Sequence, residues 1–320
     1  MNKYAKFLKG YSLVNKVFID GSAGTTGLRI RERLAGRNDI ALITLPEELR
    51  KDIAARAEAL NAADVAFLCL PDAAAIEAVS LVTNSHTAVI DTSTAHRTAA
   101  GWVYGMPELQ GQRAKIAASR RIANPGCHAS GFIALVAPLV KAGLLAPDAA
   151  LSAFSITGYS GGGKKMIAEY EAVGRDPLLE APRQYGLTQS HKHLPEMAAI
   201  CGLDHAPLFS PIVADFYAGM EVTVPLFAHQ VKGTMADIAA VYAEAYATGM
   251  IHYREAADEA GFLSAAAFAG RDDMEVTVTG NGERMLLVAR FDNLGKGASG
   301  AAIQNMNILL GTLESAGLVP

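Results

Sequence analysis

Cys127 is surrounded by residues that favour a role as nucleophile. It lies in residues 124–131, which read Asn-Pro-Gly-Cys-His-Ala-Ser-Gly, directly before an apolar pattern of helical spacing that ends at Gly143. The Pro-Gly turn predicts a helix that starts at or close to Cys127. Unpaired backbone N–H groups at a helix start favour a thiolate over a thiol, whose ordinary pKa is about 8.5, and can bind a developing oxyanion. A buried apolar cysteine is the alternative, and the polar neighbours His128 and Ser130 argue against it.

Residues 190–196, which read Ser-His-Lys-His-Leu-Pro-Glu, hold the best candidates for moving a proton to and from this thiol. His193 and Glu196 are three positions apart, so at the entry to a helix the carboxylate can orient the imidazole. His191 is the second candidate. Two histidines at i and i+2 also suggest a metal site, but no third ligand of suitable spacing lies nearby. We therefore predict acid–base chemistry here and no metal.

A run of glycines could bind an anion. Residues 158–165 read Gly-Tyr-Ser-Gly-Gly-Gly-Lys-Lys and follow a predicted strand. Consecutive glycines after a strand can form a backbone cradle, and the lysines add positive charge; a flexible loop is the competing interpretation. From this segment we take Ser160, Gly161 and Gly162 as cofactor-binding candidates and Lys164 as a substrate-binding candidate.

Polar residues that follow a predicted strand at residues 88–91 are further candidates, because ligands collect at the carboxyl ends of parallel strands. Ser93 and Arg97 belong to this cluster, and Arg183 lies farther along the chain. An arginine can clamp a phosphate or carboxylate with two hydrogen bonds, although a lone arginine is more often a surface ion-pair partner.

The chain opens with a pattern typical of dinucleotide binding. Residues 16–20 form a short apolar strand, residues 21–27 read Gly-Ser-Ala-Gly-Thr-Thr-Gly, and a helical pattern follows from Leu28. The glycines allow backbone amides to approach a pyrophosphate at the helix start. The cofactor-binding candidates here are Gly21, Ser22, Gly24, Thr25, Thr26 and Gly27. A plain tight turn is the alternative.

The second predicted strand, residues 40–45, bears on the choice of cofactor. Enzymes that prefer NAD usually carry an acidic residue at the tip of this strand. Here the tip reads Thr-Leu-Pro, with two glutamates only afterwards and with Arg50, Lys51 and Arg56 close by. We predict NADP.

Alternating strands and helices predict an α/β fold with a doubly wound, mostly parallel, Rossmann-like sheet. Beyond Cys127 the pattern changes to alternating strands at residues 151–157, 221–226, 273–279 and 285–291, which predict an α+β catalytic and oligomerisation domain with a mixed or antiparallel sheet. Residues 293–300 form a glycine-rich loop that opens a last helix, and this helix could pack back on the first domain. We divide the chain into residues 1–126 with 294–320, the dinucleotide-binding domain, and residues 127–293.

Composition excludes several classes of protein. The 320 residues are 51% hydrophobic and 19% charged with a net charge of −4, as in a compact enzyme, and no basic stripe suggests nucleic acid. Residues 1–15 carry lysines without an apolar block, so they predict a leader before the first strand rather than a secretion signal. No apolar run is long enough for a membrane span. Cys69, Cys127 and Cys201 fit neither a disulfide framework nor a zinc site, which favours a cytoplasmic protein.

Taken together and in order, these motifs resemble the N-acetyl-gamma-glutamyl-phosphate reductases of the shorter-chain type, which are related to the aspartate-semialdehyde dehydrogenases. The resemblance spans about residues 16–313. It rests on the glycine turn at 21–27, Ser-Thr-Ala-His-Arg at 93–97, Pro-Gly-Cys-His at 125–128, the glycine run at 158–165, His-Lys-His-Leu-Pro-Glu at 191–196 and Lys-Gly-Ala-Ser-Gly at 296–300. The cysteine and histidine motifs are specific together, whereas the glycine runs alone are not.

The resemblance implies that NADPH reduces N-acetyl-glutamyl 5-phosphate to N-acetyl-glutamate 5-semialdehyde and phosphate, in arginine biosynthesis. It implies a cysteine thioester on Cys127, with His193 as acid and base, Glu196 as its orienter and His191 as runner-up or substrate contact. Arg97, Ser93, Lys164 and Arg183 would meet the anionic substrate, and Lys296 and Gly297 the cofactor. A homodimer or homotetramer is implied, with no nucleic acid or membrane partner.

Other functions stay open at this point. Another phosphorylating semialdehyde dehydrogenase, acting on aspartate semialdehyde or on a substrate linked to a carrier protein, shares the thiol chemistry. A catalytically inactive NADP-binding regulator would not need Cys127, His193 and Glu196 together. A thiol hydrolase would leave the glycine turn unexplained.

Overall fold

The first half of the chain folds into a parallel sheet with helices on both faces. The computed structural model describes residues 14–320, so the predicted leader, residues 1–15, lies outside the described residues except for its last two, and Asn15 already begins the first strand. Within residues 14–320 this sheet has six parallel strands in the order β2-β1-β3-β4-β6-β5. The strands are β1 (Asn15–Asp20), β2 (Ile40–Ile43), β3 (Val65–Leu68), β4 (Ala88–Asp91), β5 (Val103–Tyr104) and β6 (Arg121–Ala123).

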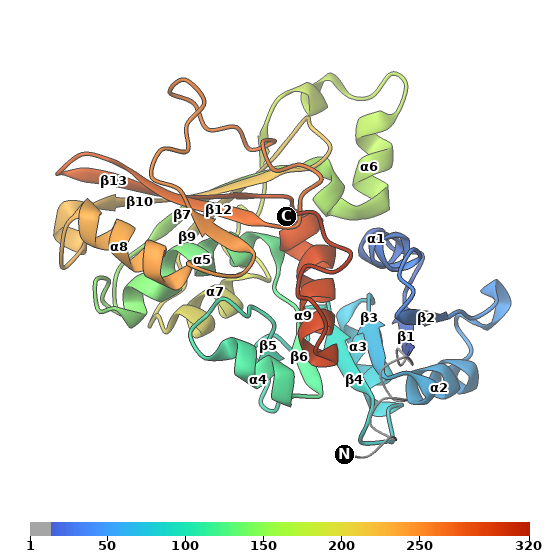
Figure 1. Cartoon of the computed structure of the whole chain (residues 1–320). Helices are drawn as coiled ribbons and strands as arrows, with labels where there is room; N and C mark the ends of the chain where they lie inside the picture. The colour runs from blue at the N-terminus through green and yellow to red at the C-terminus, as the bar shows by residue number, and fades with distance from the viewer. Residues whose placement is uncertain (1–13) are drawn as a thin grey trace, which may run out of the picture.

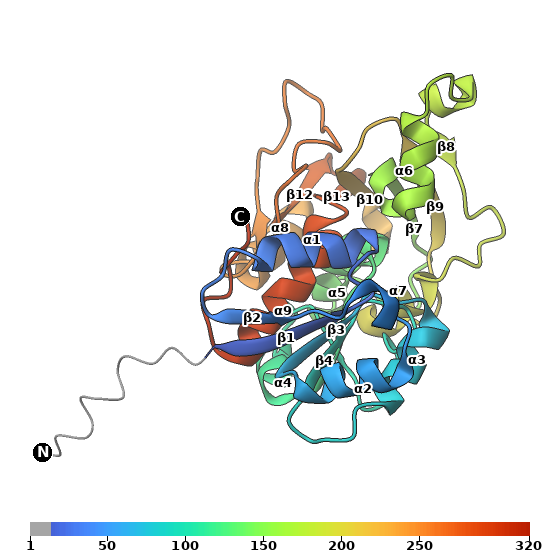
Figure 2. The same cartoon turned by 90° about the vertical axis from the view of Figure 1, so that its right-hand side faces the viewer.

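Side chains that alternate along these strands fill two separate cores. Ile19 and Phe67 pack on one face against α1 (Thr25–Leu34), α4 (Gln112–Ala118) and α9 (Gly300–Leu310). Phe18 and Leu68 pack on the other face against α2 (Ile53–Ala62) and α3 (Asp72–Ser80). Both faces are apolar because a parallel sheet is covered on both sides. The predicted doubly wound fold is confirmed (Figures 1 and 2).

The second sheet is mixed, as predicted. Among the described residues it has seven strands in the order β11-β12-β13-β10-β7-β9-β8, with parallel pairs β11/β12 and β7/β9 and antiparallel pairs elsewhere. The strands are β7 (Ser152–Gly158), β8 (Arg183–Gln184), β9 (Leu208–Ala214), β10 (Met220–Phe227), β11 (Ile251–Tyr253), β12 (Met274–Gly280) and β13 (Arg284–Phe291). The helices α5 (Cys127–Lys141), α7 (Leu194–Cys201) and α8 (Met235–Ala245) lie on one face of this sheet (Figure 1), and α6 (Gly163–Glu171) stands beside α1.

Helix α5 begins at Cys127, which confirms the predicted helix start. Its residues from Ala129 to Ala137 are buried between the second sheet and α7. Pro138 inside the helix cannot donate a backbone hydrogen bond. The carbonyl of Ala134, one turn earlier, instead accepts the Tyr246 hydroxyl at 2.5 Å, so the helix continues through the proline without an unpaired carbonyl.

The glycine-rich stretch near the C-terminus is a helix, not the predicted loop. Gly295–Ser299 form one π-helical turn that runs directly into α9. A Cβ on Gly295 would lie 1.9 Å from the Arg271 carbonyl oxygen, so glycine is needed there for close packing rather than for flexibility. Helix α9 does pack back on the first sheet through Ile303 and Met306, as predicted.

Short helical turns complete the described structure: η2 (Glu47–Leu49), η3 (Tyr159–Gly162), η4 (Pro177–Glu180) and η5 (Ala228–Gln230). No helix in residues 14–320 combines the length and apolar character that crossing a bilayer requires. The same residues contain no cluster of three or more His, Cys, Asp or Glu side chains able to hold a metal ion.

Candidate active site

Cys127 lies half-buried at the wall of a cavity of about 320 Å³. Residues from both sheets line this cavity, including Thr26, Arg97, Asn124, His128, Tyr185, His191, Lys192, His193, Asn293 and Gly297. A Cβ on Gly297 would approach the Cys127 Cβ to 3.0 Å, so the π-helical turn packs tightly against the Cys127 side chain. The thiol, two of the predicted histidines and Arg97 therefore share one cavity.

The predicted thiolate is opposed by burial. Removal of water raises the pKa of Cys127 above its ordinary value, and Arg97, the His128 backbone N–H and Lys192 only partly counter this rise. The Glu196 carboxylate adds to it. The thiol is consequently the favoured resting form, and a role as nucleophile would require a nearby base to take its proton.

Glu196 does not orient His193, contrary to the prediction. Its Oε1 accepts a hydrogen bond from Arg97 Nη1 at 2.6 Å. Its Oε2 accepts one from the Tyr104 hydroxyl at 2.7 Å and one from the Gly126 backbone N–H at 3.2 Å. Burial raises the pKa of Glu196, whereas the three donors oppose this and hold the anion. The side chain faces the junction of the two sheets, where Arg97 and the Pro-Gly turn lie, so it fixes the backbone just before Cys127.

Glu196→Gln tests this arrangement through the thiol. Because the Glu196 charge raises the pKa of Cys127, its removal should lower that pKa and speed alkylation of Cys127 by iodoacetamide severalfold at pH 7. Turnover should nevertheless fall about 10²-fold, because the turn before Cys127 loses its anchor. The rate of alkylation against pH, with the exposed Glu283→Gln as control, is the measurement. A pKa of Cys127 that rises or stays constant contradicts this role.

The cavity contains three histidines, of which the sequence pointed to two. His193 is buried, its Nδ1 has no hydrogen-bond partner within residues 14–320, and burial with the Arg97 charge lowers its pKa well below the ordinary value. Burial lowers the pKa of His191 to about 4, and its Nδ1 accepts the His193 backbone N–H at 3.2 Å. Both rings are thus neutral near pH 7, as bases must be.

His128 is the third histidine, and the sequence analysis used it only as a polar neighbour. Its Nδ1 lies 2.7 Å from Ser155 Oγ and its Nε2 lies 2.6 Å from the Tyr185 hydroxyl. Burial lowers its pKa to about 3, so it is neutral and fully hydrogen-bonded. Its position directly after the cysteine could have revealed it; Tyr185 and Ser155 carry no comparable signal.

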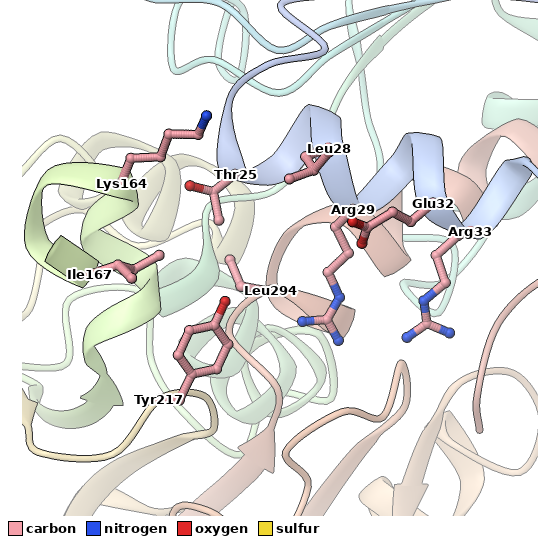
Figure 3. A pocket seen from close by; sticks show the side chains of 9 residues that line it. All are labelled: Thr25, Leu28, Arg29, Glu32, Arg33, Lys164, Ile167, Tyr217 and Leu294. Carbon is pink, nitrogen blue, oxygen red and sulfur yellow. The ribbon is translucent and has the colours of Figure 1, made fainter. Parts of the chain in front are cut away.

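Of the three cations predicted to bind substrate, the structure brings only Arg97 to the thiol cavity. The Arg183 guanidinium donates to the Tyr170 hydroxyl at 3.1 Å and lies over that ring. Lys164 lines a separate cavity of about 380 Å³ with Thr25, Arg29 and other residues of α1 (Figure 3). Neither side chain lines the cavity of Cys127.

The glycine turn after β1 forms the wall of a second cavity, about 300 Å³, that adjoins the thiol cavity through Thr26. Gly21 has φ +84°, and a Cβ on it would lie 2.2 Å from the Cys69 carbonyl oxygen. A Cβ on Gly27 would lie 2.5 Å from the Gly21 carbonyl oxygen. The turn therefore exposes the first N–H groups of α1, whose N-cap Gly24 offers no side chain to bond them, and a pyrophosphate fits this set of donors.

Some of the other residues predicted to bind a ligand line this second cavity, and others do not. Ser93, Ser160 and Gly161 line it, and Gly162 lines the thiol cavity. Ser93 Oγ donates to Asp91 at 2.7 Å and Ser160 Oγ accepts Asn293 Nδ2 at 2.9 Å. Lys296 is different: its ammonium is buried and donates to Glu108 at 2.7 Å and to Gln304, so its side chain holds the fold together instead of facing the cofactor cleft.

A further cavity, about 670 Å³, lies at the ends of β1 and β2 and is lined by Gly21 and Ser22. The cations Arg31, Arg50 and Lys51 line it, and none of them forms a salt bridge within the described residues. Arg56, which the sequence placed close to this strand end, also lines the cavity, but it is buried and bonded to Asp20 at 3.0 Å and to Glu77 at 3.3 Å.

Both parts of the chain match models of the semialdehyde dehydrogenase family. Residues 16–118 match the family model "Semialdehyde dehydrogenase, NAD binding domain", and residues 127–293 match "Semialdehyde dehydrogenase, dimerisation domain". The N-acetyl-gamma-glutamyl-phosphate reductase of Mesorhizobium japonicum is 49% identical over 92% of this chain and 99% of its own length. N-acetyl-gamma-glutamyl-phosphate reductase 2 of Pseudomonas putida is 45% identical over 94% and 98% of the two chains.

Solved structures agree in fold. Aspartate semialdehyde dehydrogenase II of Vibrio cholerae, complexed with ASA, has a TM-score of 0.68 at 16% identity and covers 93% of this chain and 98% of its own. Aspartate semialdehyde dehydrogenase of Francisella tularensis has a TM-score of 0.69 at 13% identity, with 92% and 100% covered. At such identities the likeness concerns the fold alone.

Proposed function

Because the chain belongs to the semialdehyde dehydrogenase family and, within it, to the N-acetyl-gamma-glutamyl-phosphate reductases, we propose that it reduces N-acetyl-L-glutamyl 5-phosphate to N-acetyl-L-glutamate 5-semialdehyde and phosphate, a step of arginine biosynthesis. One observation carries the proposal: a cysteine at a helix start shares a cavity with three neutral histidines, and this cavity adjoins a glycine turn suited to a dinucleotide.

The reaction begins with loss of the thiol proton. His193 takes it, since its ring is neutral and its Nε2 lies close against the Gly126 turn that leads into Cys127. The sulfur attacks the carbonyl carbon of the acyl phosphate, the carbon–oxygen bond to phosphate breaks, and a thioester remains on Cys127. Backbone N–H groups at the start of α5 support the oxyanion that develops at the carbonyl.

The second half of the reaction returns the enzyme to its thiol. A bound nicotinamide supplies the hydride that reduces the thioester carbon. Protonated His193 gives its proton to the carbonyl oxygen, which yields a thiohemiacetal on Cys127. His193 then removes the proton of that hydroxyl, the carbon–sulfur bond breaks, and the aldehyde leaves as the thiolate recovers a proton. His191 contacts the substrate, and Glu196 holds Arg97 and the Gly126 turn in place.

The preferred cofactor in this proposal is NADP. Arg31, Arg50 and Lys51 surround the cavity at the end of β2, where a 2′-phosphate on the adenosine ribose would need positive charge. Glu47 and Glu48 line the same cavity and would repel that phosphate, so the preference rests on the three cations.

The proposed domains are residues 1–126 with 294–320 for the dinucleotide and residues 127–293 for catalysis and assembly. The sheet face opposite α5, α7 and α8 exposes Phe154, Leu208, Phe227 and Leu286, and these apolar side chains suit a second copy of the chain. A homodimer or homotetramer on this face is measurable by sedimentation equilibrium. A cytoplasmic location accords with the three unpaired cysteines and can be checked by cell fractionation.

The direct test is the reverse reaction. Purified enzyme should reduce NADP only when N-acetyl-glutamate semialdehyde and inorganic phosphate are both present, with a higher kcat/KM for NADP than for NAD. Aspartate semialdehyde under the same conditions tests the related activity. Equal or better turnover of aspartate semialdehyde, or turnover without phosphate, contradicts the proposal.

A further inference from the structure

The thiol cavity has little free positive charge for an acyl phosphate. Arg97 has five N–H donors, but three of them are used by the protein: Nε by the Asn124 carbonyl oxygen at 3.0 Å, Nη1 by Glu196 at 2.6 Å and Nη2 by the Thr92 carbonyl oxygen at 3.3 Å. Its charge is balanced by the buried carboxylate beside it. Lys164 and Arg183 lie outside this cavity, so the cations predicted to bind the substrate do not supply enough positive charge for its phosphate.

Lys192 is positioned to supply the missing charge. It lies between His191 and His193, its side chain is exposed, and it lines both the thiol cavity and the adjoining cavity at the glycine turn. In residues 14–320 it forms no salt bridge. The charged side chain across the second cavity is Asp72, the first residue of α3, whose oxygens accept the Thr94 N–H and hydroxyl. The hydrogen bonds from Thr94 lower the pKa of Asp72 most, and the nearby charge of Lys192 lowers it further.

We propose that Lys192 binds the phosphate group of the acyl phosphate and holds the inorganic phosphate as it leaves Cys127. This inference rests on the proposed function, since it assumes a phosphorylated substrate. A phosphate between Cys127 and Lys192 has the thiol on one side and, on the other, an ammonium that forms no salt bridge in residues 14–320. This ammonium stabilises the negative charge that develops on the oxygens of the leaving phosphate. Lysine suits this role because its ammonium is a compact charge on a flexible stem that can follow the departing group.

The position of Lys192 also links phosphate to the histidines. Burial is the main cause of the lowered pKa of both His193 and His191, and the charges of Arg97 and Lys192 lower both values further. A bound phosphate offsets the Lys192 charge, which makes His193 a better base when the thiol must lose its proton. Once phosphate has left, the charge acts on His193 again, and the protonated ring becomes a stronger acid when the thioester is reduced.

The first experiment measures alkylation of Cys127 and needs no substrate. Inorganic phosphate should protect the wild-type thiol from iodoacetate, and Lys192→Met should raise the phosphate concentration for half-protection about tenfold or more. Lys192→Met should also lower the rate with anionic iodoacetate more than the rate with neutral iodoacetamide. Lys192→Arg should restore part of both effects, and Lys165→Met, at an exposed lysine that lines none of the four cavities described, should behave as wild type.

The second experiment separates phosphate from the cofactor. In the reverse reaction Lys192→Met should raise the KM for inorganic phosphate about tenfold or more while the Kd for NADP, measured by fluorescence, changes less than twofold. Phosphate protection equal to wild type in Lys192→Met overturns the inference, as does a loss of NADP affinity as large as the loss for phosphate. A wrong substrate assignment would abolish turnover with N-acetyl-glutamate semialdehyde but leave the alkylation result intact, so the two failures are distinguishable.

Discussion

Replacing Cys127 by serine should lower kcat/KM by about 10⁴-fold or more, because the variant cannot form the thioester. A serine hydroxyl is far less acidic than a thiol, and neutral His193 cannot make it an effective nucleophile unaided. The measurement is phosphate-dependent reduction of NADP by N-acetyl-glutamate semialdehyde. NADP affinity should stay within about twofold of wild type, since Cys127 lines the thiol cavity and not the cavity at the glycine turn.

A second thiol provides the control for this prediction. Cys201 is buried in the core on α7, and burial raises its pKa, so it has no access to substrate. Cys201→Ala should lose some stability but retain most turnover. Mass spectrometry of wild-type enzyme mixed with the acyl phosphate in the absence of cofactor should find the acyl group on Cys127. Near-normal turnover by Cys127→Ser would rule out the covalent mechanism.

The second large effect is expected for His193→Asn, which should lower kcat/KM about 10²–10⁴-fold. The pH profile should change shape as well. The pKa of His193 lies well below its ordinary value, so the base is already neutral throughout the range above pH 6.5 and wild-type kcat/KM should be nearly flat there. Without this base, attack depends on thiolate formed spontaneously, and burial raises the pKa of Cys127. Residual activity of the variant should therefore rise about tenfold per pH unit through neutrality.

His191→Asn is the matched control, because its ring shares the cavity but its Nδ1 already accepts the His193 backbone N–H. We expect it to raise the KM for the semialdehyde with a smaller loss of kcat. If His191→Asn shows the large loss and the sloping profile while His193→Asn does not, the roles of the two histidines are exchanged.

Much of the fold was predictable because its signals are local. The strands that begin the chain, the glycine turn and the start of α5 depend on neighbouring residues: apolar runs, glycines and a Pro-Gly turn. The strands β5, β6, β8, β9 and β11 were not predicted. Four of them are only two or three residues long, and β9 contains Pro211, which weakens the pattern of a strand. Their pairing comes from the rest of the two sheets.

The residue types of the candidate site follow from the sequence alone: a cysteine after a Pro-Gly turn, two histidines around Lys192, and a glycine turn after a strand. Only the tertiary structure decided which charged side chain bonds to which partner. Glu196 bonds the Gly126 N–H 70 positions away, and Lys296 bonds Glu108 188 positions away. A buried charge must find a partner wherever the fold brings one, because leaving it unpaired costs several kcal/mol. Spacing in the sequence carries no record of those encounters, which is why the spacing assigned Glu196 to the nearest histidine and the resemblance assigned Lys296 to the cofactor.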